Sequence, residues 1–459
     1  MKECGKLTFK ECELFILRQS VDKIEKFIKK EKINSPEINK IFKIVETFIE
    51  KRKVMCYGGT AINNILPKKE QFYDRNIDLP DYDFFSKTPI KHSKELADIF
   101  YKNGYKHIEA KAGFHSGTFK IYVNFIPIAD ITYFPEKLFD KVWKERLIRK
   151  NISYLPPNFL RLLMYLELSR PKGYIQRWEK VLKRLTKLNK IYPIKNNHCN
   201  IVNDKCKYKI SDNIYYIIRD TIIVNNGVFF GSYATDKYLK INKTFKKKYK
   251  IFNLRYFDVL SENPKNLTKN IYDNLIKNGI SNIKIKKVNG IGDIISTHYK
   301  ILYNNKILCF IYKPLGCHSY NIVKKHGRSI KIATIDTLLM YYLMFLYIKK
   351  PYYNTNNILC MAEFLFKLQQ KNRLKQNGLL KRFTINCIGE QETFESIRLN
   401  RYNISKKIKR KSKDWDFYFL KYIPSKNKKS KTKKSKTKKT APGVPPLLPS
   451  PLALATQNV

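Results

Sequence analysis

The first 50 residues alternate apolar and polar positions with the period of an α-helix. One apolar stripe runs through Leu14, Leu17, Val21, Ile24, Phe27 and Ile28. A second stripe, from Ile38 to Ile49, follows Ser35-Pro36, a pair typical of a helix N-cap and first turn. The pattern predicts two helices that lead into a short apolar strand at residues 54–57.

The stretch from Val54 to Leu66 predicts a strand, a tight turn at Gly58-Gly59 and a helix. Glycines in such a turn let an anion approach backbone N–H groups, and the helix N-terminus adds partial positive charge. Asp81 and Asp83 follow, two residues apart, so on a strand both side chains project from one face. Adjacent carboxylates repel each other unless a cation lies between them. Together the two motifs predict a site for nucleotide phosphates and Mg²⁺.

Two more strands are predicted near residues 107–110 and 119–125, the second continuing through Pro127 to Tyr133. Asp130 is the only acidic residue in this second apolar stretch. An isolated acid often lies at a strand end without further function, but the two aspartates upstream favour Asp130 as a third carboxylate of the same site. Asp414-Trp-Asp416 repeats the Asp-x-Asp spacing without a glycine turn before it, and we expect it at the surface.

Residues 156–193 have a helical pattern. Lys172 and Arg177 lie where one predicted helix ends and the next begins. From these positions both side chains are expected to reach a triphosphate, although a charged helix end is usually just solvated.

Four landmarks of the first half recur in the same order in the second half. The matched segments are 228–234 with 54–61, 256–261 with 81–86, 267–279 with 96–104, and 307–312 with 128–133. This order predicts an internal duplication of one α/β unit. The second copy keeps Asp258 in place of Asp83 but replaces three site residues: Gly59 by Ser232, Asp81 by Tyr256 and Asp130 by Phe310. We therefore expect a catalytic first copy and an inert second copy.

These patterns predict an α+β protein with mixed sheets flanked by helices, plus further helical segments. The predicted units are N-terminal helices (1–53), a catalytic domain with a helical extension (54–193), a loop (194–213), a second, degenerate domain with C-terminal helices (214–424) and a disordered Lys/Ser- and Pro-rich tail (425–459).

Charge points to a polyanionic partner. The chain has 459 residues and a formal net charge of +53, from 91 Lys and Arg against 38 Asp and Glu. Nucleic acid and an acidic membrane surface both fit this excess. An AT-rich genome would also raise the lysine content, but it explains the shortage of acids less well.

Two further features bear on where the protein acts. The longest apolar run, Leu338–Ile348, is too short to span a bilayer, and the N-terminus lacks the apolar core of a signal peptide. The nine cysteines include no Cys-x-x-Cys pair. Dispersed cysteines predict unpaired thiols in a reducing compartment, hence a soluble intracellular protein.

Four motifs resemble one family in detail. They are similar to motifs of the poly(A) polymerase catalytic subunits of large DNA viruses. The four motifs are Tyr57-Gly-Gly-Thr-Ala-Ile-Asn63, Pro80-Asp-Tyr-Asp-Phe-Phe-Ser86, Leu96-Ala-Asp-Ile-Phe-Tyr-Lys-Asn-Gly-Tyr105 and Ala129-Asp-Ile-Thr-Tyr133. The closer similarity is to the giant-virus and African swine fever virus type, within the nucleotidyltransferase superfamily that includes DNA polymerase β. The resemblance covers roughly residues 35 to 350.

The resemblance implies a duplicated nucleotidyltransferase fold and an enzyme that adds AMP from ATP to the 3′ end of viral mRNA. Asp81, Asp83 and Asp130 would hold two Mg²⁺ or Mn²⁺ ions, and Gly58, Gly59 and Thr60 would contact the phosphates. RNA is the implied partner, together with a second copy of the chain or a separate viral processivity subunit. The implied setting is the infected-cell cytoplasm, in a virus factory, with packaging in the virion as a further expectation.

Two other functions remain open from the residues alone. One is a template-independent RNA nucleotidyltransferase that adds CMP or UMP, because base choice depends on residues that the motifs do not include. The other is a non-catalytic, basic nucleic-acid-binding protein, against which the intact set of three aspartates argues.

Overall fold

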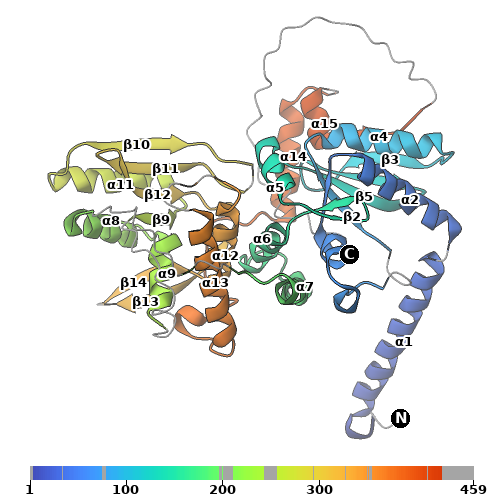
Figure 1. Ribbon diagram of the computed structural model, residues 1–459, viewed down its shortest axis with the longest axis horizontal. Helices are drawn as coiled ribbons and strands as arrows, with labels where there is room; N and C mark the ends of the chain where they lie inside the picture. The colour runs from blue at the N-terminus through green and yellow to red at the C-terminus, as the bar shows by residue number, and fades with distance from the viewer. Residues whose placement is uncertain are drawn as a thin grey trace, which may run out of the picture.

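The computed structural model describes residues 4–33, 35–74, 79–195, 199, 210–241, 256–292, 294–325, 327–348, 350, 354–410 and 412–425 (Figure 1). Most of the predicted loop at 194–213 and nearly all of the predicted tail at 425–459 lie outside these residues. The described chain forms two mixed, eight-stranded sheets flanked by helices, which confirms the α+β class.

The first sheet and its helices come mainly from the first 200 residues. The elements are α1 (Phe9–Ile33), α2 (Pro36–Lys51), β1 (Met55–Tyr57), α3 (Gly58–Ile65), η2 (Lys68–Glu70), β2 (Tyr82–Ser86), α4 (Pro89–Lys102), β3 (Ile108–Ala112), β4 (Thr118–Val123), β5 (Ile126–Tyr133), α5 (Glu136–Lys144), β6 (Leu147–Arg149), β7 (Ile152–Tyr154), α6 (Pro157–Leu168), η3 (Ile175–Arg177) and α7 (Trp178–Ile191).

The two predicted N-terminal helices differ in what their apolar stripes contact. The α2 stripe from Ile38 to Ile49 is buried against the first sheet, as its amphipathic pattern predicts. The α1 stripe, from Leu14 to Ile28, is exposed along its length. Figure 1 accordingly shows α1 projecting away from the rest of the chain.

One strand prediction was wrong. The chain does not run straight from Phe119 to Tyr133 but reverses at Asn124 and Phe125, whose φ angles are 50° and 66°. Val123 then pairs with Ile126 across the antiparallel strands β4 and β5. Asparagine adopts this left-handed backbone more readily than most residues, so Asn124 was the signal for the turn.

The second sheet is built from later residues. Its elements are α8 (Asp212–Val224), β8 (Val228–Phe230), α9 (Gly231–Leu239), β9 (Phe257–Leu260), α11 (Pro264–Lys277), β10 (Ile283–Val288), β11 (His298–Tyr303), β12 (Lys306–Tyr312), β13 (His318–Lys325), β14 (Arg328–Ala333), α12 (Ile335–Phe345), α13 (Thr355–Lys371), η4 (Gly378–Leu380) and β15 (Cys387–Ile388), followed by α14 (Phe394–Lys407), α15 (Lys413–Phe419) and β16 (Lys421–Tyr422).

The two sheets repeat one topology. Apart from the edge strands β16 and β15, the first has the order β3-β4-β5-β2-β1-β7-β6 and the second β10-β11-β12-β9-β8-β14-β13. Each step between neighbours has the same parallel or antiparallel sense in both sheets. The sequence landmarks that recur therefore lie on structurally matching strands.

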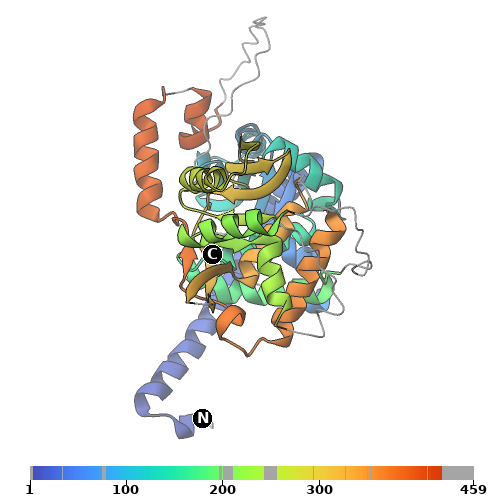
Figure 2. The same cartoon turned by 90° about the vertical axis from the view of Figure 1, so that its left-hand side faces the viewer.

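The two halves meet through helices, with α6 and α12 packed against each other between the sheets (Figure 1). Figure 2 looks at the second half from its own side, with α1 extending beyond both halves. Every residue of α12 is buried, which explains the long apolar run in this part of the sequence. β16 pairs with β3 at the edge of the first sheet. The sequence grouped residues 413–422 with the second unit, whereas in the structure β16 extends the first sheet and α15 packs against β3.

The prediction of unpaired cysteines was wrong for six of them. The structure forms the disulfides Cys4–Cys12, Cys199–Cys360 and Cys317–Cys387, while Cys56 and Cys309 are buried thiols. These partners lie up to 161 residues apart in the chain, so spacing alone could not reveal them. None of the described helices is long and apolar enough to cross a bilayer.

Candidate active site

Asp83 and Asp130 lie side by side in the middle of the first sheet. Asp83 is on β2 and Asp130 on β5, and the parallel register of these strands makes the two residues direct partners. Both are almost fully buried, and Asp81 lies just before β2. The structure thus brings the predicted third carboxylate next to the Asp-x-Asp pair.

The Gly58-Gly59 turn packs directly against these aspartates. Tyr57 of β1 is the register partner of Asp83, and Gly58 follows with a φ of +72°. A Cβ atom at position 58 would collide with Oδ2 of Asp83, so glycine is required both for the backbone angle and for the close approach. The turn starts α3, so the N-terminus of this helix lies beside the Asp83 carboxylate.

Thr60 holds Asp81 in place. Its hydroxyl Oγ1 accepts a hydrogen bond from the backbone N–H of Asp81 at 3.3 Å, and the Thr60 side chain is buried. The sequence predicted a direct contact between Thr60 and phosphate. That contact stays a prediction, and in the structure Thr60 also links the glycine turn to the first aspartate.

Burial and mutual repulsion raise the pKa of the aspartates. Burial, and next the Asp130 carboxylate, raise the pKa of Asp81 to about 6. Burial, followed by Asp81 and Asp130, raises the pKa of Asp83 well above its usual range. Lys120 of β4 counteracts both shifts, and its ammonium nitrogen lies 2.9 Å from Oδ2 of Asp130.

A basic helix face lies opposite the carboxylates. Arg177 ends η3, and Lys180 and Arg184 continue along α7. Arg177 lowers the pKa of Asp83, while Lys180 and Arg184 lower that of Asp81. Arg184 also lies beside the glycine turn, because a Cβ atom on Gly59 would come within 2.7 Å of its Nη2.

The sequence predicted Arg177 as a phosphate contact but did not predict Lys180 or Arg184. Their spacing of three and seven residues from Arg177 was the available signal, since it places all three on one helix face. Lys172 lies in the exposed turn after α6, and the structure shows no contact between it and the aspartates. Lys120 was also missed, because only the pairing of β4 with β5 brings it to Asp130.

The carboxylates fit a divalent cation by their chemistry. Oxygen donors suit Mg²⁺, and a cation would relieve the repulsion that raises the pKa of Asp81 and Asp83. Within the described residues, no three acidic, His or Cys side chains are already oriented as a metal site. Lys120 contributes to this arrangement, since it draws the Asp130 carboxylate into an ion pair.

At the equivalent position of the second sheet, the aspartate is paired with a lysine and not with a second carboxylate. Asp258 on β9 pairs in register with Phe230 and Phe310, as Asp83 does with Tyr57 and Asp130. The buried ammonium of Lys350 forms an ion pair with Asp258 and donates to the Tyr312 hydroxyl at 3.0 Å. A side-chain cation from the chain itself therefore neutralises the one remaining aspartate.

Fold and site together resemble one class of enzyme. A glycine turn, an Asp-x-Asp pair, a third aspartate on the adjacent strand and a facing basic helix are the features of a nucleotidyltransferase. Residues 43–173 match the family model described as "Poly(A) polymerase catalytic subunit". This match falls on the unit that carries all three aspartates.

Relatives in large DNA viruses agree with this class. A protein of Acanthamoeba polyphaga mimivirus, named a poly(A) polymerase catalytic subunit, is 26% identical over 80% of this chain and 70% of its own length. A protein of the same name from African swine fever virus (isolate Tick/Malawi/Lil 20-1/1983) is 30% identical over 38% of each chain. The chain thus matches well under half of the length of the swine fever virus relative.

A solved structure shares the fold. The crystal structure of the Megavirus polyadenylate synthase superposes with a TM-score of 0.76 at 21% identity, over 90% of this chain and 86% of the other. These comparisons confirm the predicted resemblance to viral poly(A) polymerase catalytic subunits, and with it the expectation of an enzyme of this class.

Proposed function

We propose that this chain adds AMP from ATP to the 3′ end of viral mRNA, using a duplicated nucleotidyltransferase fold in which only the first copy is catalytic. The observation that carries the proposal is the register of β2 and β5, which sets Asp83 beside Asp130. The Gly58 turn packs against this pair, and a basic helix face lies opposite. The second sheet lacks this set, since Phe310 takes the position of Asp130.

In the proposed reaction, the RNA 3′-oxygen bonds to the α-phosphorus of ATP and the bond to pyrophosphate breaks. Asp81 and Asp83 would hold one Mg²⁺ or Mn²⁺ ion on the triphosphate. The same two residues, together with Asp130, would hold a second ion near the 3′-hydroxyl. When bound, such ions lower the pKa of the attacking hydroxyl and neutralise charge on the leaving group. For Asp130 to take part, Lys120 must release it.

The remaining residues would position the substrates. The backbone N–H groups at Gly58 and Gly59, at the start of α3, suit phosphate oxygens. Arg177, Lys180 and Arg184 supply positive charge where pyrophosphate accumulates negative charge. Lys172, in its exposed turn, stays a prediction as a further phosphate contact.

The test is primer extension by the purified chain with each of the four NTPs and an oligo(A) primer. ATP alone should be incorporated efficiently, in a reaction that requires Mg²⁺ or Mn²⁺. Preferred use of CTP or UTP would instead identify a different RNA nucleotidyltransferase. Binding of RNA without extension by any NTP would identify a non-catalytic protein.

The partners follow from the same proposal. RNA would be held by non-specific phosphate contacts, consistent with the net charge of +53. The protein partner, a second copy of the chain or a separate processivity subunit, stays a prediction, as does action in the cytoplasm of the infected cell. Measuring the solution mass of the chain during processive extension separates self-pairing from the need for another subunit.

A further inference from the structure

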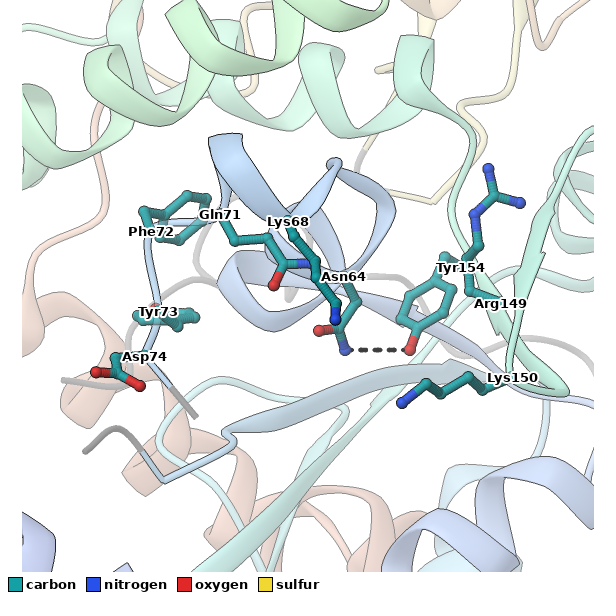
Figure 3. Close-up of a pocket in the computed structure, with 9 residues that line it drawn as sticks. All are labelled: Asn64, Lys68, Gln71, Phe72, Tyr73, Asp74, Arg149, Lys150 and Tyr154. Carbon is teal, nitrogen blue, oxygen red and sulfur yellow. Dashed lines mark hydrogen bonds between the residues drawn. The ribbon is translucent and has the colours of Figure 1, made fainter. Parts of the chain in front are cut away.

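A cavity of about 740 Å³ lies between the segment that follows α3 and the β6–β7 hairpin. Figure 3 shows the side chains of Lys68, Lys150 and Tyr154 directed into the space between these two parts of the chain. The nine residues that line it are Asn64, Lys68, Gln71, Phe72, Tyr73, Asp74, Arg149, Lys150 and Tyr154.

The lining combines positive charge with aromatic rings. Three basic residues, Lys68, Arg149 and Lys150, line the cavity against the single acid Asp74, and the Arg149 guanidinium also donates to the carbonyl of Ile148 at 2.9 Å. Phe72 and Tyr73 supply partly exposed rings, Asn64 and Gln71 supply amide groups, and Tyr154, which is almost fully buried, completes the wall. Aromatic rings beside cations suit a single strand of nucleic acid, because bases stack on the rings while phosphates contact the cations.

Both walls of the cavity are held by specific contacts. The backbone N–H groups of Phe72 and Tyr73 donate to Oδ1 of Asn63 at 2.8 and 3.0 Å, which fixes the segment after α3. On the other wall, Lys150 and Asn151 both adopt positive φ angles, and this tight turn joins β6 to β7. Asn64 bridges the walls through a 3.1 Å hydrogen bond to the Tyr154 hydroxyl.

The cavity shares a wall with the candidate active site. Arg184 donates to the Tyr73 hydroxyl, and its guanidinium carbon lies 5.3 Å from the centre of the Phe72 ring. Both Tyr73 and Arg184 border Gly59, since a Cβ atom there would meet each of them. The cavity therefore lies next to the glycine turn, with the Tyr73 and Arg184 side chains forming the wall between them.

We propose that this cavity binds the RNA strand immediately upstream of its 3′ end. The inference rests on the proposed function. In the proposed function, the glycine turn and the cations Arg177, Lys180 and Arg184 already bind the triphosphate of ATP. Three additional cations outside that set suit a backbone that carries a phosphate on every nucleotide, rather than a single mononucleotide.

The test compares R149Q/K150Q and K68Q with the unmodified chain. Arg149 and Lys150 are exposed at a hairpin tip, so the melting temperature should not change. A double variant in the second half, K265Q/K269Q, removes the same charge from the exposed face of α11 and serves as the matched control. Fluorescence anisotropy without ATP measures binding of oligo(A), and primer extension measures KM for primer and for ATP separately.

For R149Q/K150Q, the Kd and KM for oligo(A) should rise about tenfold, and KM for ATP should stay within about twofold. The slope of log Kd against log salt should become shallower by about 1.4, as expected for two lost contacts to single-stranded phosphates. K68Q should show the same pattern at about half the size, and K265Q/K269Q should match the unmodified chain.

Two results would overturn the proposal. A rise in KM for ATP with unchanged RNA binding would assign the cavity to the incoming nucleotide. Equal behaviour of R149Q/K150Q and K265Q/K269Q would show that the cavity contributes nothing beyond general charge. Failure of the unmodified chain to extend any primer would count against the proposed function instead, because the anisotropy comparison does not depend on catalysis.

Discussion

Phe310 pairs with Asp258 across β12 and β9 in the register in which Asp130 pairs with Asp83 across β5 and β2. This substitution at a matched position is one of the differences between two sheets of the same topology. The aromatic ring leaves Asp258 without a second carboxylate, and the Lys350 ammonium occupies that neighbourhood, 4.3 Å from the centre of the Phe310 ring. The expected difference in chemistry between the two units can be tested residue by residue.

Replacing Asp83 by alanine should reduce ATP incorporation into oligo(A) by about 10³-fold or more, because the three carboxylates act on the reacting groups as a unit. Primer extension under single-turnover conditions measures this loss. Asp414→Ala is the control, since Asp414 belongs to the other Asp-x-Asp motif, on α15, and should keep activity within about twofold. Extension by Asp83→Ala at the rate of the unmodified chain would rule out the proposed site.

Gly58→Ala should lose both stability and activity, because a Cβ atom would strike Asp83 and the φ angle of +72° is unfavourable for alanine. We expect a loss of about 1–2 kcal/mol in stability and at least about 100-fold in extension rate. Gly231→Ala is the matched variant, with a φ of +63° at the equivalent turn of the second sheet. It should lose similar stability, yet the folded protein should extend primers normally. Equal loss of activity in both variants would contradict a role specific to Gly58.

Activity should fall as the pH drops below about 6, because the pKa of Asp81 is raised to about 6 and a protonated carboxylate binds cations poorly. Lys120 favours the charged forms of Asp81 and Asp83, so Lys120→Met should raise their pKa and move the acid limb of the pH–rate profile upward by roughly half to one pH unit. Lys111→Met is the control, since Lys111 on the adjacent β3 lies 3.3 Å from Glu109 instead. An acid limb that shifts equally in both variants would show that only overall charge matters.

Asp81→Asn should stabilise the protein at neutral pH while abolishing activity. The pKa of Asp81 is higher in the folded chain than the usual unfolded value near 4, so the folded state binds more protons between about pH 4 and 6. Stability is therefore lost as the pH rises through this window, and the full penalty is present above pH 6. In EDTA at pH 7.5, removing the charge should add about 1–3 kcal/mol, with no gain below pH 4.

Thermal melting at both pH values, with and without Mg²⁺, measures this effect. Mg²⁺ should raise the melting temperature of the unmodified chain more than that of Asp81→Asn, because the ion relieves the same repulsion. A variant that is less stable than the unmodified chain at pH 7.5 would show that Asp81 is already neutralised within the fold.

Lys350→Ala should destabilise the second unit by about 3–5 kcal/mol, because it leaves the Asp258 carboxylate buried without its cation. The double variant Asp258→Leu/Lys350→Met should regain most of this loss in denaturant unfolding. Neither change should alter the extension rate per folded molecule by more than about twofold. A large loss of rate in the stable double variant would assign catalysis to the second unit as well.

The sequence by itself determined what depends on neighbours along the chain. The two-residue spacing predicts that Asp81 and Asp83 lie close together, the glycine turn predicts a phosphate-type loop, and the amphipathic period of α2 specifies its buried side. The order of recurring landmarks also revealed two similar units, because each landmark is itself a local pattern. Even here a turn was missed, at Asn124-Phe125, where an apolar run hid a hairpin.

Only the tertiary structure decided which distant residues meet. Strand pairing brings Asp130 to Asp83 and Lys120 to Asp130, and the packing of α7 brings Arg184 to Gly59. The Lys350–Asp258 pair and the disulfides arise in the same way. The physical reason is that the face of a residue follows from the geometry of its own element. Its partners, by contrast, depend on which elements bury their apolar surfaces against one another, and no local spacing records that choice.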